Sequence, residues 1–72
     1  MISKIDIDDW FVLPVRELYK VKPRSYVMVP DMDDLVLFFD HIDGMYSYCV
    51  DMQNNVTHIA AWTKVLPMER KA

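Results

Sequence analysis

The dipeptide Asp43-Gly44 stands between two apolar runs, residues 35–42 and 45–50, and it constrains the fold more than any other stretch of the chain. Asp-Gly in that setting is among the strongest short-range signals for a β-hairpin with a two-residue turn. Both central residues of a type I′ turn need a positive φ, which Gly accepts freely and Asp tolerates. Asn54-Asn55 supplies a second turn signal further along. The sequence therefore predicts a three-stranded antiparallel meander.

Two-residue loops at both turns would fix the register of this meander, with Ile42 opposite Met45 and Phe39 opposite Tyr48. Paired residues share a face of the sheet, and successive residues alternate between faces. The face predicted to be the core is nearly continuously apolar and comprises Leu35, Leu37, Phe39, His41, Tyr46, Tyr48, Val50, Met52, Thr57, Ile59 and Ala61. The opposite face is mixed and comprises Val36, Phe38, Asp40, Ile42, Met45, Ser47, Cys49, Asp51, His58 and Ala60.

The mixed face holds too many hydrophobic residues for a surface that meets only water, because exposing apolar area costs about 25 cal/mol per Å². It is therefore expected to be covered. One candidate cover is the N-terminal segment, which carries Ile5, Trp10, Phe11 and Leu13. The other is a second copy of the chain or a foreign protein.

The length of 72 residues predicts a single domain with a small core and marginal stability. A hydrophobic content of 53% implies that some apolar side chains stay at the surface or lie against a partner. The single cysteine excludes an intramolecular disulfide. The net charge of −3 argues mildly against a phosphate-binding protein, which usually carries a basic patch. No apolar run approaches the length of a membrane span, and the N-terminus lacks the apolar core of a signal peptide, so a cytoplasmic protein is expected.

The N-terminal third of the chain gives the most ambiguous signals. Ile2, Ile5 and Ile7 suggest an edge strand or an extended arm. Residues 8–17 are expected to form a loop or a single helical turn, and residues 18–22 a strand, although Pro14 can also begin a short helix. Periodicity alone does not separate these alternatives.

The signals after this region are clearer. Residues 25–29 are predicted to form a strand that Pro30 closes, and residues 31–34 to form a charged loop. A further strand is predicted at 56–59, followed by a break of one turn and a short closing strand at 63–67, the order in which SH3-like barrels end. Residues 68–72 are expected to be a frayed polar tail. The predicted fold is a mostly β single domain over residues 1–72, an SH3-like barrel or a curled antiparallel meander with at most one short helix near the N-terminus.

The run THIAAWTKVLP, residues 57–67, resembles the close of small accessory proteins encoded by tailed bacteriophages. Such proteins often finish in a His-x-x-Ala-Trp-Thr-type segment and a Pro. The resemblance covers residues 41–67. It implies a dispensable phage protein that acts on a component of the host, and it implies no particular partner.

Cys49, Asp51 and His58 form the sharpest candidate chemical site, because the predicted register places Asp51 opposite His58 and Cys49 diagonal to it. A thiol, an imidazole and a carboxylate within reach of one another can form a nucleophilic site or supply zinc ligands. The alternative is a cross-strand Asp–His pair beside a small half-buried residue. No oxyanion-hole loop or fourth ligand is visible in the sequence, so this alternative is preferred. We expect no catalytic residue, no metal site and no cofactor.

A basic stretch, Arg16, Lys20, Lys22 and Arg24, is interleaved with Tyr19 and Tyr26. Cationic and aromatic residues in this arrangement are typical of proteins that bind single-stranded nucleic acid. A solvated strand face that balances the acidic turns explains the same residues, and the chain as a whole is acidic. Nucleic acid is therefore not the expected partner.

The function predicted from these observations is that of a small non-enzymatic protein-binding module, with a phage-encoded inhibitor or modulator of a host protein as its specific form. A host protein is the expected partner, a homodimer is the alternative to it, and no membrane contact is expected. Two further alternatives are an oligomeric protein that sequesters a nucleotide-like molecule between aromatic residues, and a small barrel that binds single-stranded nucleic acid. The residues predicted to bind the partner are Phe38, Asp40, Ile42, Met45, Cys49, Asp51, His58 and Trp62.

Overall fold

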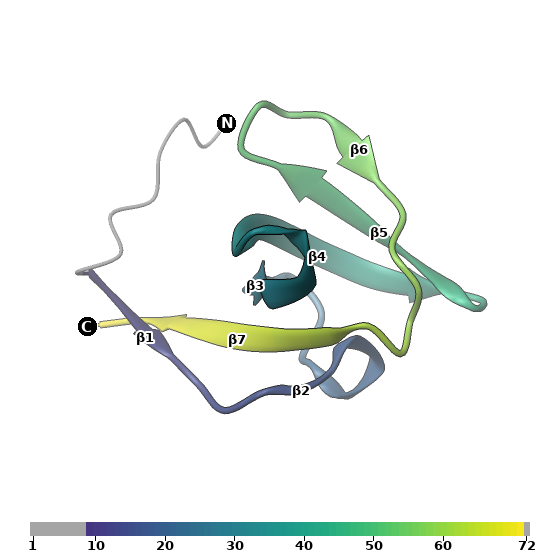
Figure 1. Ribbon diagram of the computed structural model, residues 1–72. Coiled ribbons are helices and arrows are strands. Elements are labelled where there is room, and N and C mark those ends of the chain that lie inside the picture. Colours follow the sequence, from purple (N-terminus) through teal and green to yellow (C-terminus); the bar gives the residue numbers. More distant parts are fainter. Residues whose placement is uncertain (1–8, 72) are drawn as a thin grey trace.

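A computed structural model describes residues 9–71 of the chain (Figure 1). The elements in this part are β1 (Trp10–Val12), β2 (Arg16–Glu17), the 3₁₀ turn η2 (Leu18–Lys20), β3 (Ser25–Val29), the 3₁₀ turn η3 (Pro30–Met32), β4 (Leu35–Asp43), β5 (Tyr46–Asp51), β6 (Val56–Thr57) and β7 (Lys64–Arg70). All strand pairs are antiparallel, in the order β1-β7-β3-β4-β5-β6 with β2 also against β7. The predicted mostly β fold, a curled antiparallel sheet, is confirmed. The predicted edge strand at Ile2, Ile5 and Ile7 lies outside the described residues.

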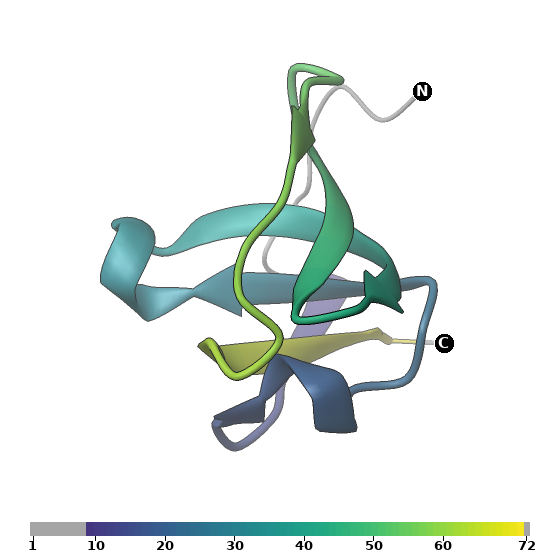
Figure 2. The ribbon, with the colours of Figure 1, turned by 90° about the vertical axis from the view of Figure 1, so that its right-hand side faces the viewer.

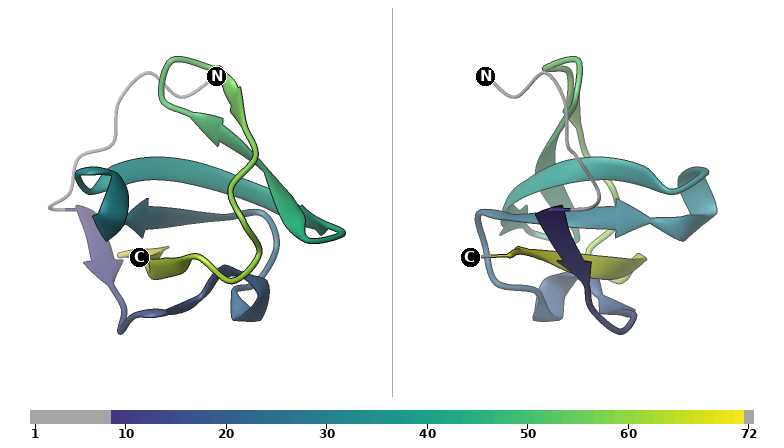
Figure 3. Two further views of the ribbon diagram at one scale, coloured as in Figure 1. Left: turned by 45° about the vertical axis from the view of Figure 1, so that its right-hand side comes forward. Right: turned by 90° about the vertical axis from the view of Figure 1, so that its left-hand side faces the viewer.

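The sheet is strongly curled, so that β5 and β6 rise away from β3 and β7 (Figure 2). β7 lies between β3 on one side and β1 followed by β2 on the other. The tip of the β4–β5 hairpin projects from the body of the sheet (Figure 3). Neither 3₁₀ turn, nor any other helix in residues 9–71, has the length and apolar character needed to cross a membrane.

The N-terminal elements differ from the prediction. Within residues 8–17, expected to be a loop or a helical turn, lie the short strands β1 and β2, and the strand predicted at 18–22 is wrong because η2 begins at Leu18. Leu18 and Val21 are the buried residues here, and their spacing of three matches the three-residue period of a 3₁₀ turn. The Leu18 N–H donates to the Thr63 carbonyl at 2.9 Å, which holds η2 against the chain that enters β7.

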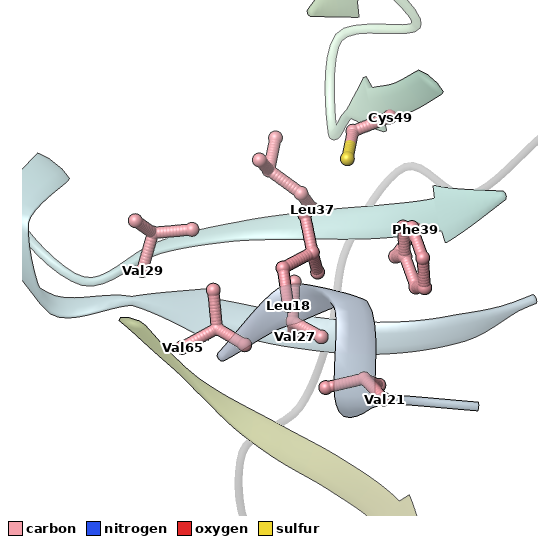
Figure 4. Packing of buried hydrophobic residues seen from close by; sticks show 8 residues of the cluster. All are labelled: Leu18, Val21, Val27, Val29, Leu37, Phe39, Cys49 and Val65. Carbon is pink, nitrogen blue, oxygen red and sulfur yellow. The ribbon is translucent and has the colours of Figure 1, made fainter. Parts of the chain in front are cut away.

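The core lies on the concave side of the sheet and is closed by η2 (Figure 4). η2 and the residue after it supply Leu18 and Val21, and the strands supply the other buried members of the hydrophobic cluster: Val27, Val29, Leu37, Phe39, Cys49 and Val65. The predicted strand at residues 25–29 is confirmed by β3, which lies between β4 and β7 and contributes two of these residues.

The loop of the β4–β5 hairpin is Gly44-Met45, one residue later than predicted. Asp43 is therefore the last residue of β4 and pairs with Tyr46. Of the two loop residues only Gly44 has a positive φ, at 64°. A type II′ turn requires a positive φ at its first central position alone, a position that Gly usually occupies. The Asp-Gly signal predicted the hairpin correctly and its register wrongly.

A β-bulge at Asp40 reverses the alternation of faces partway along β4. Before the bulge, Leu37 and Phe39 point into the core, as predicted. After it, Ile42 packs against the core and His41 is exposed, the reverse of the prediction. The extra residue thus exchanges the buried and exposed positions in the part of β4 that follows it.

The buried face of β5 is the opposite of the predicted one. Ser47 and Cys49 are completely buried, whereas Tyr46 and Tyr48 are exposed. A shift of register by one residue exchanges the two faces of a strand, which is the physical reason for this error. Val50 and Met52, also predicted in the core, are half-buried.

The end of the chain is more ordered than predicted. Met68 is buried and belongs to β7 with Glu69 and Arg70, although residues 68–72 were expected to form a frayed tail. The Lys71 N–H donates to the Asp9 carbonyl at 2.8 Å. β7 ends the fold after a turn at residues 61–62, so the predicted strand–turn–strand order is correct and the closing strand is longer than expected.

Candidate functional site

The outer side of the β4–β5 hairpin, near its tip, carries an exposed group of aromatic, histidine and acidic side chains. His41 pairs with Tyr48, and Asp43 pairs with Tyr46. The chain after β6 continues beside β5, because Tyr46 also forms a bridge with Ala60. We name this surface the hairpin face and define it by His41, Asp43, Tyr46, Tyr48 and His58.

Three rings lie side by side across the three strand segments of the hairpin face. The His41 and Tyr48 rings are stacked, with centroids 5.5 Å apart and planes at 9°. The Tyr48 and His58 rings meet edge to face at 5.7 Å. Cross-strand side-chain pairs on an exposed sheet face contribute about 0.2–1 kcal/mol. Paired strands therefore hold the His41 and Tyr48 rings, and the His58 ring comes from the segment after β6.

Hydrogen bonds orient both histidines. The Nδ1–H of His58 donates to the Ser47 carbonyl at 2.8 Å, and the Nδ1–H of His41 donates to Asp40 Oδ2 at 2.6 Å. The Ser47 carbonyl can only accept, so the proton of a neutral His58 ring is on Nδ1 and its Nε2 carries the lone pair. His58 therefore presents an acceptor nitrogen rather than a donor when it is neutral.

A shallow open hollow of about 450 Å³ lies at the tip of the hairpin face and is lined by Asp43, Tyr46 and His58. Tyr46 is 55% exposed, and the adjoining turn residue Met45 is 65% exposed. The Ala61 N–H donates to the Met45 carbonyl at 2.9 Å, which ties the segment before the exposed Trp62 to the same tip. Large side chains thus stay in water around an acidic hollow.

The charge around the hairpin face is one-sided. Between Arg24 and Lys64 the sequence contains six aspartates and neither lysine nor arginine. The Nζ of Lys64 lies 2.9 Å from Glu17 Oε2, and the Nζ of Lys20 lies 3.5 Å from Glu17 Oε1. The pKa of Glu17 is lowered to about 2, chiefly by the hydrogen bond from Lys64 and next by one from the backbone N–H of Glu17, with a smaller effect of the Lys20 charge. Lys64 is therefore engaged with Glu17, whereas Arg24 lies beside β4, where its backbone N–H donates to the Asp40 carbonyl at 3.2 Å.

The predicted group of Cys49, Asp51 and His58 is not assembled. Asp51 closes the β5–β6 turn, where its Oδ1 accepts the backbone N–H groups of Gln53 and Asn55 at 2.8 and 2.9 Å. These hydrogen bonds lower the pKa of Asp51, and the bond from the Asn55 N–H has the largest effect. Residues 49 and 57 pair, rather than 51 and 58, because the turn extends over residues 51–55.

Cys49 lies in the core, and burial raises the pKa of its thiol. Among the described residues, no group of three or more His, Cys, Asp or Glu side chains is placed to hold a metal ion. The Cys49 thiol is consequently neither ionised readily nor accessible, the two properties that a nucleophilic cysteine requires.

The predicted partner-binding residues separate into two groups. Asp40, Met45, His58 and Trp62 lie on or beside the hairpin face. The remaining four lie elsewhere: Ile42 against the core, Cys49 within it, Asp51 in its turn and Phe38 on the outer side of β4. Sequence reasoning missed His41, Asp43, Tyr46 and Tyr48, because the shifted register placed them in the core or the turn. The small side chains of Ser47 and Cys49 beside two tyrosines were a signal for the opposite arrangement, since a buried tyrosine needs a partner for its hydroxyl.

The outer side of β3 and β4 is covered in part by the N-terminal segment, one of the two covers predicted for Val36 and Phe38. Trp10 meets Tyr26 edge to face at 5.1 Å, and Tyr26 meets Phe38 in the same way at 5.1 Å. Phe11 of the same segment is exposed and Leu13 is half-buried, while Ile5 lies outside the described residues. Phe38 is therefore part of an aromatic row rather than of the hairpin face.

The basic stretch does not form a cationic and aromatic groove. Lys20 lies over the Tyr19 ring at 5.7 Å and pairs with Glu17, whereas Tyr26 belongs to the aromatic row. A second cavity, of about 250 Å³, is lined by Arg16 and Lys22 together with apolar residues, Ser25 and Glu69, and by no aromatic side chain. The stacking surface on which both nucleotide alternatives depend is not formed there.

No family model matches the chain, and no curated protein or solved structure is significantly similar to it.

Proposed function

We propose that this protein is a non-enzymatic protein-binding module whose contact surface is the hairpin face. The observation that carries the proposal is the exposure of Met45, Tyr46 and Tyr48 around an acidic hollow, in a chain that buries smaller residues of the same strand. Tyrosine and methionine are enriched in protein interfaces, and tyrosine is among the residues that dominate binding energies. Sheet pairing holds Tyr46 and Tyr48 in place before binding, which lowers the entropic cost of association.

The resemblance of residues 41–67 to accessory proteins of tailed bacteriophages supports a host protein as the partner. On this proposal the protein acts in the cytoplasm of an infected bacterium as an inhibitor or modulator, by occupying a surface of its target. The hairpin face lies within the segment that carries the resemblance. Inhibition by occupation requires no chemistry of the binding residues, in keeping with an interior position for the one thiol.

Affinity capture from a bacterial lysate tests the proposal when it is paired with matched variants. Tyr46→Ala removes an exposed ring from the hairpin face, and Phe11→Ala removes one from β1; the two side chains are 55% and 54% exposed. A protein captured by the wild type and by Phe11→Ala is identified by mass spectrometry, purified, and titrated calorimetrically with all three chains. We expect Tyr46→Ala to weaken binding by about 2 kcal/mol or more, as for an interface hot spot, and Phe11→Ala to leave binding unchanged.

Equal binding by both variants would show that the hairpin face is not the contact surface. Copurification of a nucleotide or an oligonucleotide, lost in Arg16→Ala or Lys22→Ala, would favour one of the two alternative functions instead. Circular dichroism of each variant separates loss of binding from loss of the fold.

A further inference from the structure

We infer that the hollow lined by Asp43, Tyr46 and His58 receives an arginine side chain of the partner protein. The inference rests on the proposed function, since it names the chemical group that the hairpin face recognises. The three lining side chains come from β4, β5 and the segment after β6, so the site exists only in the folded sheet.

Besides the Tyr46 hydroxyl, which can donate or accept, the side chains that line the hollow offer hydrogen-bond acceptors. Asp43 contributes a carboxylate, which accepts only. The Nδ1–H of His58 is used on the Ser47 carbonyl at 2.8 Å, so the neutral ring leaves Nε2 as an acceptor. A guanidinium carries five N–H donors in a planar fork and accepts nothing, which suits two acceptors supplied by different strands. The point charge of a lysine ammonium has no such geometric match.

Tyr46 supplies an exposed ring at the same hollow. Arginine stacks on aromatic faces as well as pairing with carboxylates, and a cation over a tyrosine ring gains about 0.5–2 kcal/mol depending on its desolvation. The stack of His41, Tyr48 and His58 holds the His58 ring in place beside Tyr46. The Tyr46 ring and the hydrogen-bonded His58 ring are therefore in place before a guanidinium binds.

The charges of the chain favour a foreign basic segment over a second copy. Within residues 9–71, no lysine or arginine nitrogen lies within 4.0 Å of the Asp40 or Asp43 carboxylates; His41 is the ion-pair neighbour of Asp40. Residues 25–63, which include β4, β5 and β6, contain no lysine or arginine. Arg24, whose backbone N–H donates to the Asp40 carbonyl at 3.2 Å, is the cationic residue beside this hairpin. Two copies of a chain with net charge −3 repel each other, whereas a basic partner is attracted and steered.

The test uses N-acetyl-arginine amide, and N-acetyl-lysine amide as the comparison, in a titration of the ¹⁵N-labelled full chain followed by NMR. We expect saturable shifts of the backbone amides around Asp43, Tyr46 and His58 with the arginine compound, and several-fold weaker binding of the lysine compound. Asp43→Asn should weaken arginine binding about tenfold, which corresponds to about 1.4 kcal/mol. Asp34→Asn, in the turn just before β4, is the matched control: it removes the same charge, and its φ of 58° is one that Asn tolerates.

Three outcomes would overturn the inference. Equal responses to the two compounds, or equal losses in Asp43→Asn and Asp34→Asn, would mean that only the general negative charge is sensed. Absence of shifts in the hollow, while Tyr46→Ala still abolishes capture of the partner, would refute arginine recognition and leave the proposed function standing. A dimer in light scattering that Asp43→Asn dissociates would identify a second copy as the occupant.

Discussion

The Ser47 Oγ lies 2.8 Å from the Ile59 carbonyl oxygen and 3.3 Å from the Ile59 nitrogen, so a single hydroxyl satisfies both backbone groups of a residue beyond the end of β6. Ser47 itself is completely buried. Ile59 lies after the last ladder pair of β6 and before the bridge at Ala60. The two hydrogen bonds of the Ser47 hydroxyl therefore replace the backbone pairing that ends with β6, and they hold the segment that carries His58 beside β5.

Ser47→Ala should lower the free energy of unfolding by about 1–3 kcal/mol, because it leaves a half-buried carbonyl and a half-buried N–H of Ile59 without their partner. Chemical denaturation monitored by circular dichroism measures the change. Ser25→Ala, at a half-buried position of β3, is the control and should stay within about 0.5 kcal/mol. A Ser47→Ala variant as stable as the wild type would mean that water replaces the hydroxyl.

Leu37→Ala and Tyr48→Ala should have very different effects, which tests the two faces of the hairpin. Leu37 is completely buried, so its truncation should cost about 2–5 kcal/mol. Tyr48 lies on the exposed side, and loss of its cross-strand contacts should cost only about 0.2–1 kcal/mol. The midpoints of urea denaturation give both values. Similar losses would indicate the register predicted from the sequence rather than the observed one.

The sequence was sufficient to predict the hairpin but not its register. Asp43-Gly44 identifies the turn, yet Gly44 can stand second in a type I′ loop or first in a type II′ loop, and these differ by one residue. The bulge at Asp40 has no signal in the sequence, since neither Gly nor Pro marks it. Strands without such irregularities, such as β3, were predicted correctly because alternation along them is unbroken.

The hairpin face could be predicted only in part for the same reason. Of its five residues only His58 was among those expected to bind a partner, whereas Tyr46 and Tyr48 were assigned to the core on the wrong side of β5. The 3₁₀ turn η2 was missed because residues 18–22 were interpreted as a strand, in which Leu18 and Val21 would lie on opposite faces, whereas the structure buries both. The position of η2 depends on backbone hydrogen bonds to the carbonyls of residues 61 and 63, which are distant in the sequence.

Gly44→Val should destabilise the hairpin by about 1–3 kcal/mol, the cost of holding a β-branched residue at a positive φ. A Cβ at Gly44 would meet no atom within 4 Å, so the cost is conformational rather than steric contact with a neighbour. Gly44→Asn should be better tolerated, because asparagine adopts positive φ values more readily. Thermal denaturation compares the three proteins, and equal stability of the two variants would contradict the assigned turn.

Cys49 should react slowly with iodoacetamide in the folded protein. It is completely buried, and burial raises the pKa of its thiol, so both the accessibility and the thiolate population are low. Mass spectrometry follows the alkylation with and without denaturant. The reference is a thiol at exposed Gln53 in the double variant C49A/Q53C, which should react rapidly while folded. Comparable rates for Cys49 and this reference would mean that β5 opens readily.

Glu17 should make the stability of the protein depend on pH in the acid range. Its pKa is lowered from 4.5 to about 2 by the hydrogen bond from Lys64 and by other contacts. The unfolded chain therefore binds a proton between these values that the folded chain does not, and the stability due to Glu17, complete above about pH 5, is lost as the pH falls toward about 2. The melting temperature of Glu17→Gln should accordingly fall less than that of the wild type across this range.

Lys64→Met removes the main cause of the lowered pKa of Glu17, so its acid-range slope should resemble that of Glu17→Gln. Glu69→Gln is the control, because this β7 carboxylate makes no ion pair within 4.0 Å among residues 9–71, and it should keep the wild-type slope. The Asp51 carboxylate, whose pKa its turn also lowers, should supply a remaining slope in every variant. A wild-type slope in Lys64→Met would show that the contact between β2 and β7 does not link Glu17 to folding.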